Sequence, residues 1–228
     1  MCGRYTLSSS LAELQLRFSF PAADLEHRER YNIAPTQSVL TVVNQGQEQN
    51  LGEYMRWGLV PSWAKDISIG SRMINARAET IVEKPSFRRA LQKRRCLVLS
   101  DGFYEWKRTG KDKQPMYIGL ESGQPFGMAG LWEAWKSPDG EWLHSCTIIT
   151  TQSNALMEEI HNRMPVILPR ESEPVWLDPG VDDPSRLTDL LQPYPADAMT
   201  ARPVSGLVNN ARNDFPECIA PLEDSRLV

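Results

Sequence analysis

The second residue of the chain, Cys2, follows Met1 and can carry chemistry that no other position offers. Loss of the methionine would leave an α-amine, with a pKa of roughly 7.7–8, beside a thiol with a pKa of about 8.5. An aldehyde that meets this pair forms an imine with the amine, and the thiol closes the imine into a thiazolidine ring. The alternative is an idle thiol on a frayed chain end. Position alone favours this alternative.

Two titratable residues elsewhere have local sequences that suit proton transfer. Glu105 lies in the aromatic segment 103–106, and a carboxylate flanked by aromatic surface loses solvation, which raises its pKa toward neutrality. An exposed strand glutamate beside a core tryptophan fits the same residues equally well. His161 follows an expected helix, whose carbonyl end favours the charged imidazole. We interpret His27, among charges, as solvated and His144, at the start of an apolar strand, as structural.

Amide, guanidinium and indole groups supply candidate binding residues. If segment 74–79 is extended, Asn75 and Arg77 share one face, where an amide can hold an amine and a guanidinium can take a phosphate oxygen. A solvated strand face is the commoner case. Arg163 could grip a phosphate or be a surface cation. Trp57 and Trp63 bracket a loop; core packing is favoured for Trp57, whereas base stacking and core packing are balanced for Trp63.

The sequence lacks the residue patterns that several classes of reaction require. The four cysteines are widely separated, none forms a C-x-x-C pair, and none has metal-ligand spacing to a histidine, so we expect no metal site. The chain has no glycine-rich phosphate loop and no G-x-S-x-G motif, so we expect neither a bound cofactor nor a serine hydrolase. Cys96 and Cys146 lie in apolar runs and are expected to be buried strand thiols in a reducing compartment.

Length, charge and hydropathy narrow the class further. The 228 residues, of which 41% are hydrophobic, suffice for a single domain, 1–228, with a sizeable core. The chain has no apolar run of about 18 residues and no basic-then-apolar start, which argues against a membrane span and a signal peptide and favours the cytoplasm. With a net charge of −4, any nucleic-acid site must be a local basic cluster.

Hydrophobic periodicity predicts the elements that must position these residues. Helices are expected over 8–18, behind a serine cap, over 86–95, from the cap Ser153 to His161, and over 185–191. In the second of these, a basic face that includes Arg95 is expected to face solvent. Strands are expected over 39–43, 53–59, 74–79, 97–107, 113–120, 126–131, 144–150 and 204–208. The pattern predicts an α+β fold: one compact domain of mostly antiparallel β-sheet, with a barrel-like or sandwich core and three or four peripheral helices.

The order of these residues along the chain resembles the SOS-response-associated peptidase family, also called abasic-site processing proteins. The resemblance covers nearly the whole chain. Its combination of an N-terminal cysteine with N-A-R, E-W and H-x-R-M-P is highly specific. The matching segments are 1–5, 30–35, 57–63, 74–80, 101–106, 129–132, 161–165 and 203–205.

The resemblance implies a protein that captures abasic sites in single-stranded DNA and shields the lesion in the DNA damage response. Cys2, freed of Met1 by autoproteolysis or another route, would form a thiazolidine crosslink with the aldehyde of the opened abasic sugar. Asn75 would position the amine and the ring, while Glu105 and His161 would shuttle protons during crosslinking and its slow reversal. An associated strand-cleaving lyase activity is also implied.

The resemblance further implies a set of DNA contacts. Arginines would hold the phosphates that flank the lesion, a threonine would join them, and a tryptophan with a proline would shape the pocket beside unstacked bases. In this sequence these residues are Arg4, Arg77, Arg163, Thr150, Trp63 and Pro35. We expect a cytoplasmic monomer that associates with the nucleoid when it is on DNA. The chain ends soon after the last matching segment, so we expect no C-terminal tail with partner-binding motifs.

Two other functions rank behind this one. Cys2 could be the nucleophile of a thiol hydrolase, activated by its own amine or by His161. The protein could instead be a non-catalytic reader of modified bases, whose binding is reversible, salt-sensitive and independent of Cys2.

Overall fold

The computed structural model of the protein describes residues 2–21, 25–46 and 49–222. The predicted removal of Met1, and with it the predicted start of the mature chain, lies outside these residues. The strands are β1 (Tyr5–Leu7), β2 (Arg30–Ile33), β3 (Ser38–Val43), β4 (Leu51–Trp57), β5 (Asn75–Arg77), β6 (Arg95–Ser100), β7 (Gly102–Thr109), β8 (Asp112–Leu120), β9 (Phe126–Lys136), β10 (Trp142–Gln152), β11 (Arg163–Pro165) and β12 (Met199–Pro203). The α-helices are α1 (Leu11–Phe18), α2 (Pro85–Lys93), α3 (Ala155–Glu158), α4 (Glu173–Leu177) and α5 (Pro184–Thr188).

The strands form two sheets. In the larger sheet, β10, β4, β3, β6 and β9 pair in that order, and β9 pairs again with β10, so that these strands close into a barrel. The smaller sheet has the order β12-β8-β7-β1-β2. Pairing is antiparallel except where β10 meets β4 and β5. The predicted α+β fold with a mostly antiparallel, barrel-like core is therefore confirmed.

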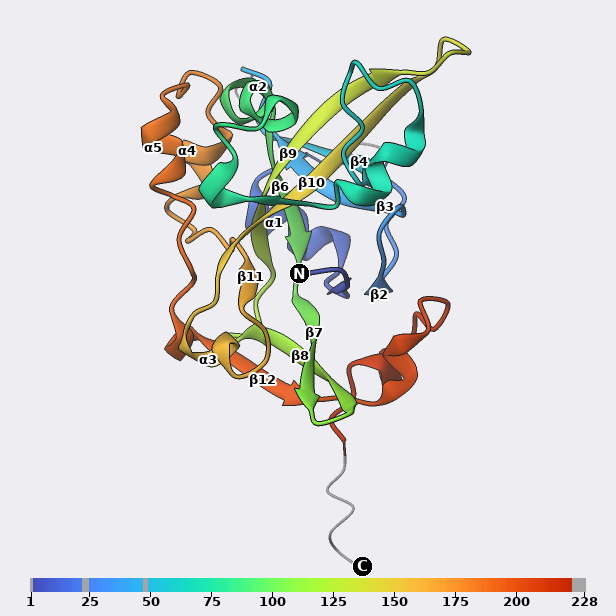
Figure 1. Cartoon of the computed structure of the whole chain (residues 1–228). Coiled ribbons are helices and arrows are strands. Elements are labelled where there is room, and N and C mark those ends of the chain that lie inside the picture. Colours follow the sequence, from blue (N-terminus) through green and yellow to red (C-terminus); the bar gives the residue numbers. More distant parts are fainter. Residues whose placement is uncertain (1, 22–24, 47–48, 223–228) are drawn as a thin grey trace, which may run out of the picture.

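The described segment that leads into β1 lies between the barrel and the hairpin of β7 and β8 (Figure 1). One large hydrophobic cluster contains side chains from both sheets, and it includes the thiol-bearing Cys2. The ring of Tyr5 on β1 meets that of Trp57 on β4 edge to face, with 5.3 Å between centroids. Because aromatic contacts of this kind add to the burial of apolar area, the core itself holds β1 against the barrel.

The single strand expected over 97–107 is two strands in different sheets. β6 belongs to the barrel and β7 to the smaller sheet, and the chain changes sheets at Asp101. The Asp101 carboxylate accepts hydrogen bonds from the Thr6 hydroxyl and from the backbone N–H and hydroxyl groups of Ser8 and Ser9. These bonds hold the turn after β1 against the break between β6 and β7.

The helices differ from expectation in number and in two details. The described residues contain five α-helices rather than three or four. The additional helix is α4, which has only five residues and is too short for hydrophobic periodicity to reveal it. The helix α3 is capped by Asn154, whose side chain accepts from the Met157 N–H, and not by Ser153. Arg95 does not face solvent: it begins β6, is buried, and donates to main-chain carbonyls at the ends of α2 and α4.

Two expected strands are shorter or lie elsewhere. The extended stretch at 74–79 ends at Arg77, and a 3-10 turn follows over Ala78–Thr80, so Glu79 does not continue the face shared by Asn75 and Arg77. The last strand is β12, which precedes the predicted 204–208. Residues Gly206–Asn209 instead form a 3-10 helix. The strands expected over 39–43 and 53–59 are found as β3 and β4, which pair antiparallel, and β4 begins and ends two residues earlier than expected.

Candidate functional site

Cys2 is fully buried beside β7. Antiparallel pairing joins Tyr5 to Phe103, and the Tyr104 N–H donates to the Arg4 carbonyl at 2.9 Å. Continuing this register brings the first residues of the chain alongside Glu105. Burial raises the pKa of the Cys2 thiol well above its usual range, and the negative charge of Glu105 raises this pKa further. Both effects favour the thiol over the thiolate.

Asn75 reaches the same place from the other sheet. It lies on β5, in parallel register with Ile148 on β10, and its Nδ2 donates to the Cys2 carbonyl at 2.9 Å. Its Oδ1 is buried and accepts no hydrogen bond from the described residues. The seam between the sheets thus contains an amide oxygen whose hydrogen-bonding capacity is unused.

Glu105 and His161 line one surface pocket together with Trp106 and Asn209. Glu105 is buried, and this burial raises the pKa of its carboxyl, while the nearby charge of His161 opposes the shift. The Arg163 N–H donates to Nδ1 of His161 at 3.0 Å, so in the neutral ring the proton sits on Nε2. A carboxyl group with a raised pKa beside an imidazole is an arrangement suited to proton transfer.

A second set of polar residues lies beside these, on the neighbouring strands β5, β10 and β11. Arg77 on β5 is the register partner of Thr150 on β10, and the Arg163 guanidinium donates to the Thr150 carbonyl at 2.7 Å. Arg163 also donates to both carboxylate oxygens of Glu79, at 2.6 and 3.0 Å. The pKa of Glu79 is lowered by these hydrogen bonds and by the positive charges of Arg163 and Arg77. The carboxylate marks a position where an anion is stabilised.

Arg4 lies against the C-terminal part of the chain. Its NH1 group donates to the Asn32 side chain at 2.8 Å and to the Val208 carbonyl at 2.7 Å, and its guanidinium lies 5.9 Å from the centre of the Trp106 ring. Sequence reasoning missed Asn32, which is buried and also donates to the Val208 carbonyl. Its only signal in the sequence was an amide flanked by Tyr31 and Ile33.

The remaining predicted residues are not joined to this cluster. Trp63 is 62% exposed and Pro35 is half-buried; among the described residues, no hydrogen bond or ring contact links either of them to Cys2 or its neighbours. Trp57 is a core residue, as predicted, and its indole N–H donates to the Ile74 carbonyl at 2.9 Å. His27, expected to be solvated, is half-buried and bridges Tyr54 and the Ser9 carbonyl.

His144 pairs with the Glu53 carboxylate, and its ring packs at a tilt against that of Trp132 with 5.1 Å between centroids, which agrees with a structural role. Within the described ranges, no cluster of three or more His, Cys, Asp or Glu side chains could hold a metal ion. No helix in the same part of the chain is long and apolar enough to cross a membrane.

The fold and site define a protein built around a buried cysteine at its second position, with an amide, a carboxyl group, an imidazole and a row of arginines beside it. The model of the SOS response associated peptidase (SRAP) family matches residues 1–211, and the chain belongs to this family. The resemblance found in the sequence is thereby confirmed.

Several relatives and solved structures are similar over most of the chain. It is 52% identical over 222 residues to the abasic site processing protein YoqW of Bacillus subtilis (strain 168), covering 96% of this chain and 99% of that one. It is 40% identical over 200 residues to the abasic site processing protein HMCES of Rattus norvegicus, covering 74% and 56%. A crystal structure of a protein from Bacteroides thetaiotaomicron superposes with a TM-score of 0.87 at 28% identity, covering 97% and 100%.

Proposed function

We propose that this protein processes abasic sites in single-stranded DNA by forming a thiazolidine between Cys2 and the aldehyde of the opened abasic sugar. The observation that carries the proposal is the convergence of Cys2, Asn75, Glu105 and His161 at the seam of two sheets. Relatives named as abasic site processing proteins support the choice of substrate. The protein would act as a monomer, in the cytoplasm, on DNA of the nucleoid.

The proposed reaction needs an amine on Cys2 and therefore the prior loss of Met1. The α-amine adds to the C1′ carbonyl carbon, and water leaves as the C=N bond forms. The sulfur then adds to the same carbon while the thiol proton passes to the ring nitrogen, so that one water is released overall. Because burial and Glu105 both keep the thiol protonated, this step needs a base at the thiol.

The neighbouring side chains suit these steps. The buried Oδ1 of Asn75 can accept an N–H from the new α-amine, and its Nδ2 already holds the Cys2 carbonyl. Glu105, with its raised pKa, can carry the proton between sulfur, water and nitrogen, and His161 can do the same for the sugar oxygen. At the imine stage, removal of a C2′ proton by either group would expel the 3′ phosphate, which accounts for a lyase activity.

The DNA contacts of the proposal follow the polar groups around Cys2. Arg77 and Arg163 would take a phosphate in place of the Glu79 carboxylate, with Thr150 supporting Arg163. Arg4 would act nearby from its fixed position against Asn32. Trp63 and Pro35 would contact bases. A site recessed between two sheets favours an unpaired strand, because a duplex would have to open to reach it.

The decisive experiment incubates the protein with an oligonucleotide that carries one abasic site, followed by a denaturing gel. Wild type should give a slowly migrating covalent band; Cys2→Ala should give none, and Cys2→Ser should give a weak, heat-labile band because oxygen closes a less stable ring. An undiminished band for Cys2→Ala would reject the proposal. Glu105→Gln should slow formation of the band by about 10²–10⁴-fold, the usual share of a general acid–base group.

Removal of Met1 can be tested separately by measuring the intact mass of the purified protein. We expect the mass of the chain without Met1 for wild type. The same mass for a Glu105→Gln/His161→Ala variant would show that removal does not depend on the site, and retention of Met1 in this variant alone would favour autoproteolysis. Retention of Met1 in a wild-type protein that still crosslinks would contradict the proposed chemistry.

A further inference from the structure

We propose that Arg108 and Lys113, on the hairpin of β7 and β8, form a second phosphate subsite that holds the DNA strand on one side of the abasic nucleotide. The inference rests on the proposed function and adds to it a path for the flanking strand. It concerns residues that lie outside the cluster of Cys2, Asn75, Glu105 and His161.

The two cations are placed directly opposite each other. Arg108 on β7 and Lys113 on β8 are register partners in the antiparallel ladder, and both are exposed. Like charges opposite each other on a sheet are unfavourable. Neither side chain forms an ion pair with any residue that the structure describes. A pair of unneutralised cations in this position is suited to binding an anion from solution.

The pair also borders the candidate site. Arg108 and Lys113 line the same pocket as Glu105, Trp106 and His161. Trp106 and Asn209 also line this pocket, and the Trp106 indole N–H donates to the Asn209 side chain at 2.7 Å. This hydrogen bond helps to hold the part of the pocket between Glu105 and Arg108 in place. A strand joined covalently at Cys2 would therefore have a continuous, partly basic surface leading from the reacting sugar onto the hairpin.

The charge of the hairpin departs from that of the chain. The whole protein carries −4, yet residues 107–113 hold four cations and one anion, a net charge of +3. Within this stretch, Lys107 is directed to Glu159 at 3.4 Å. The hairpin points away from the barrel (Figure 1). It is the kind of local basic cluster that an acidic protein needs in order to hold a polyanion.

Because of the position of the hairpin, the proposed subsite can contact the DNA strand on only one side of the abasic nucleotide. Arg77 and Arg163 belong to the strands β5 and β11 of the larger sheet, whereas Arg108 and Lys113 belong to the smaller sheet. Cys2 lies at the seam between them. A strand that crosses the seam can place its phosphates on one side against the first group and on the other side against the second.

The experiment measures crosslinking rates and equilibrium binding with three oligonucleotides: one with nucleotides on both sides of the lesion, one with only the 5′ flank and one with only the 3′ flank. A reduced, unreactive abasic analogue is used for binding, so that this readout does not require the crosslink. The variant is Arg108→Gln/Lys113→Gln. The matched control is Arg88→Gln/Arg89→Gln, which removes two cations from α2, remote from the pocket.

We expect the hairpin variant to crosslink about tenfold more slowly on substrates that carry one of the two flanks, and at the wild-type rate on the substrate that lacks this flank. The slope of log affinity against log salt should shrink by about 0.7 for each phosphate that the hairpin no longer neutralises. The inference is overturned if the hairpin variant matches the α2 control in rate and salt slope on all three substrates, or if both flanks are affected equally. Absence of any Cys2-dependent crosslink would reject the proposed function, and the binding measurements would still decide the subsite.

Discussion

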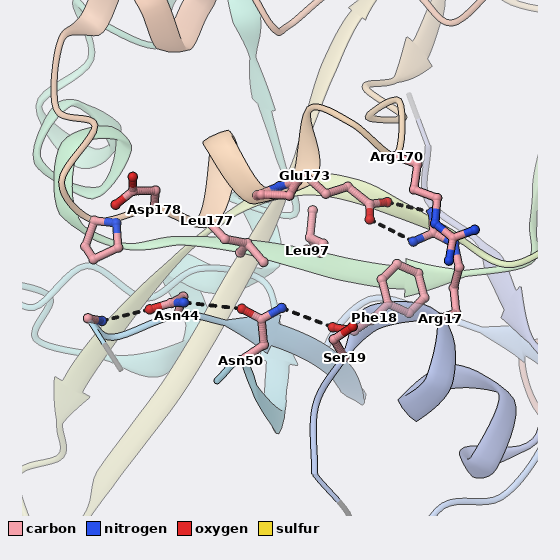
Figure 2. Close-up of a pocket in the computed structure, with 13 residues that line it drawn as sticks. Arg17, Phe18, Ser19, Asn44, Asn50, Leu97, Arg170, Glu173, Leu177 and Asp178 are labelled. Carbon is pink, nitrogen blue, oxygen red and sulfur yellow. Dashed lines mark hydrogen bonds and ion pairs between the residues drawn. The ribbon is translucent and has the colours of Figure 1, made fainter. Parts of the chain in front are cut away.

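Two arginine–glutamate pairs with the same two-pronged geometry lie in different surroundings. Arg17 on α1 donates to both carboxylate oxygens of Glu173 on α4, each at 2.8 Å, and both residues line one pocket (Figure 2). This pocket contains none of Cys2, Asn75, Glu105 and His161. Arg163 donates to both oxygens of Glu79 beside that site. The side chains of the first pair are 12% and 8% exposed, and those of the second are 14% and 49% exposed.

The difference in burial decides the charge energetics of the two carboxylates. Burial raises the pKa of Glu173 in spite of Arg17, whereas the hydrogen bonds from Arg163 lower the pKa of Glu79. The first carboxylate thus depends on its partner to stay ionised, and the second would be solvated without its partner. We infer that Arg17–Glu173 is a fixed structural pair and that Glu79 is an exchangeable occupant of an anion site, which a DNA phosphate can replace.

The largest expected effect is the loss of stability when the fixed pair is broken. Arg17→Met leaves the Glu173 carboxylate buried without its guanidinium, and removing one partner of a buried pair costs about 3–5 kcal/mol of unfolding free energy. Urea unfolding followed by circular dichroism measures this change. The crosslinking rate per folded molecule should stay at the wild-type value, because this pocket contains none of the proposed catalytic residues.

The matched control removes both charges. Arg17→Met/Glu173→Leu should recover most of the stability, because well-packed apolar residues often replace a buried pair without cost. A double variant as unstable as Arg17→Met would show that the pocket depends on the shape of these side chains rather than on their charges.

The next effect concerns the exchangeable pair. Arg163→Gln should weaken binding of single-stranded DNA with an abasic analogue about tenfold, since the phosphate then has one charge-assisted hydrogen-bond donor fewer. The same change should lower stability by less than about 1 kcal/mol, because the Glu79 side chain is half exposed. Fluorescence anisotropy and urea unfolding measure the two quantities. A stability loss as large as that of Arg17→Met, with DNA binding unchanged, would make Arg163 a structural residue.

A smaller effect of opposite sign should follow from removing the competitor. Glu79→Gln leaves Arg163 and Arg77 without their carboxylate, so a DNA phosphate no longer has to displace an anion. We expect binding to tighten by about two- to fivefold, in line with the modest strength of exposed ion pairs. Asp139→Asn, which removes an exposed carboxylate from the turn between β9 and β10, controls for the change in net charge. Weaker binding by Glu79→Gln would mean that Glu79 holds Arg163 in place for DNA.

Local patterns predicted most of the individual elements. The helix α1 begins after Ser10, whose side chain accepts a hydrogen bond from the Glu13 N–H, and β3 and β4 lie within two residues of the strands expected there. Predictions were wrong where the helical spacing of residue types continues in the sequence beyond the residue at which the helix ends. Arg95 extends the basic face of α2 in sequence, yet Arg94 leaves the helical conformation and Arg95 turns inward to cap carbonyls.

The candidate site could be predicted only from the resemblance to a family, and the reason is physical. Asn75 meets Cys2 through the register of β5 on β10, and Glu105 meets Cys2 through the register of β1 on β7. Such registers join segments far apart in the chain, and no local periodicity encodes them. The burial of Cys2 was unexpected from its terminal position. The basic pair of Arg108 and Lys113 was visible as charge but not as part of a pocket.

The smallest expected effect is on the pH dependence of stability, which should differ between the two arginine–glutamate pairs. Glu79 has a lowered pKa in the folded state, so its contribution to stability is present above the usual value of 4.5 and is lost as pH falls through the lowered pKa. Glu173 has a raised pKa, so between 4.5 and that raised value the folded state holds more protons, and stability declines as pH rises. Urea unfolding of wild type, Glu79→Gln and Glu173→Gln from about pH 3 to about pH 8 should give differences of opposite slope. Exposure of Glu79 limits its share to under about 1 kcal/mol. Slopes of the same sign would mean that burial does not distinguish the pairs, and the distinction between a fixed and an exchangeable partner would have to rest on DNA binding alone.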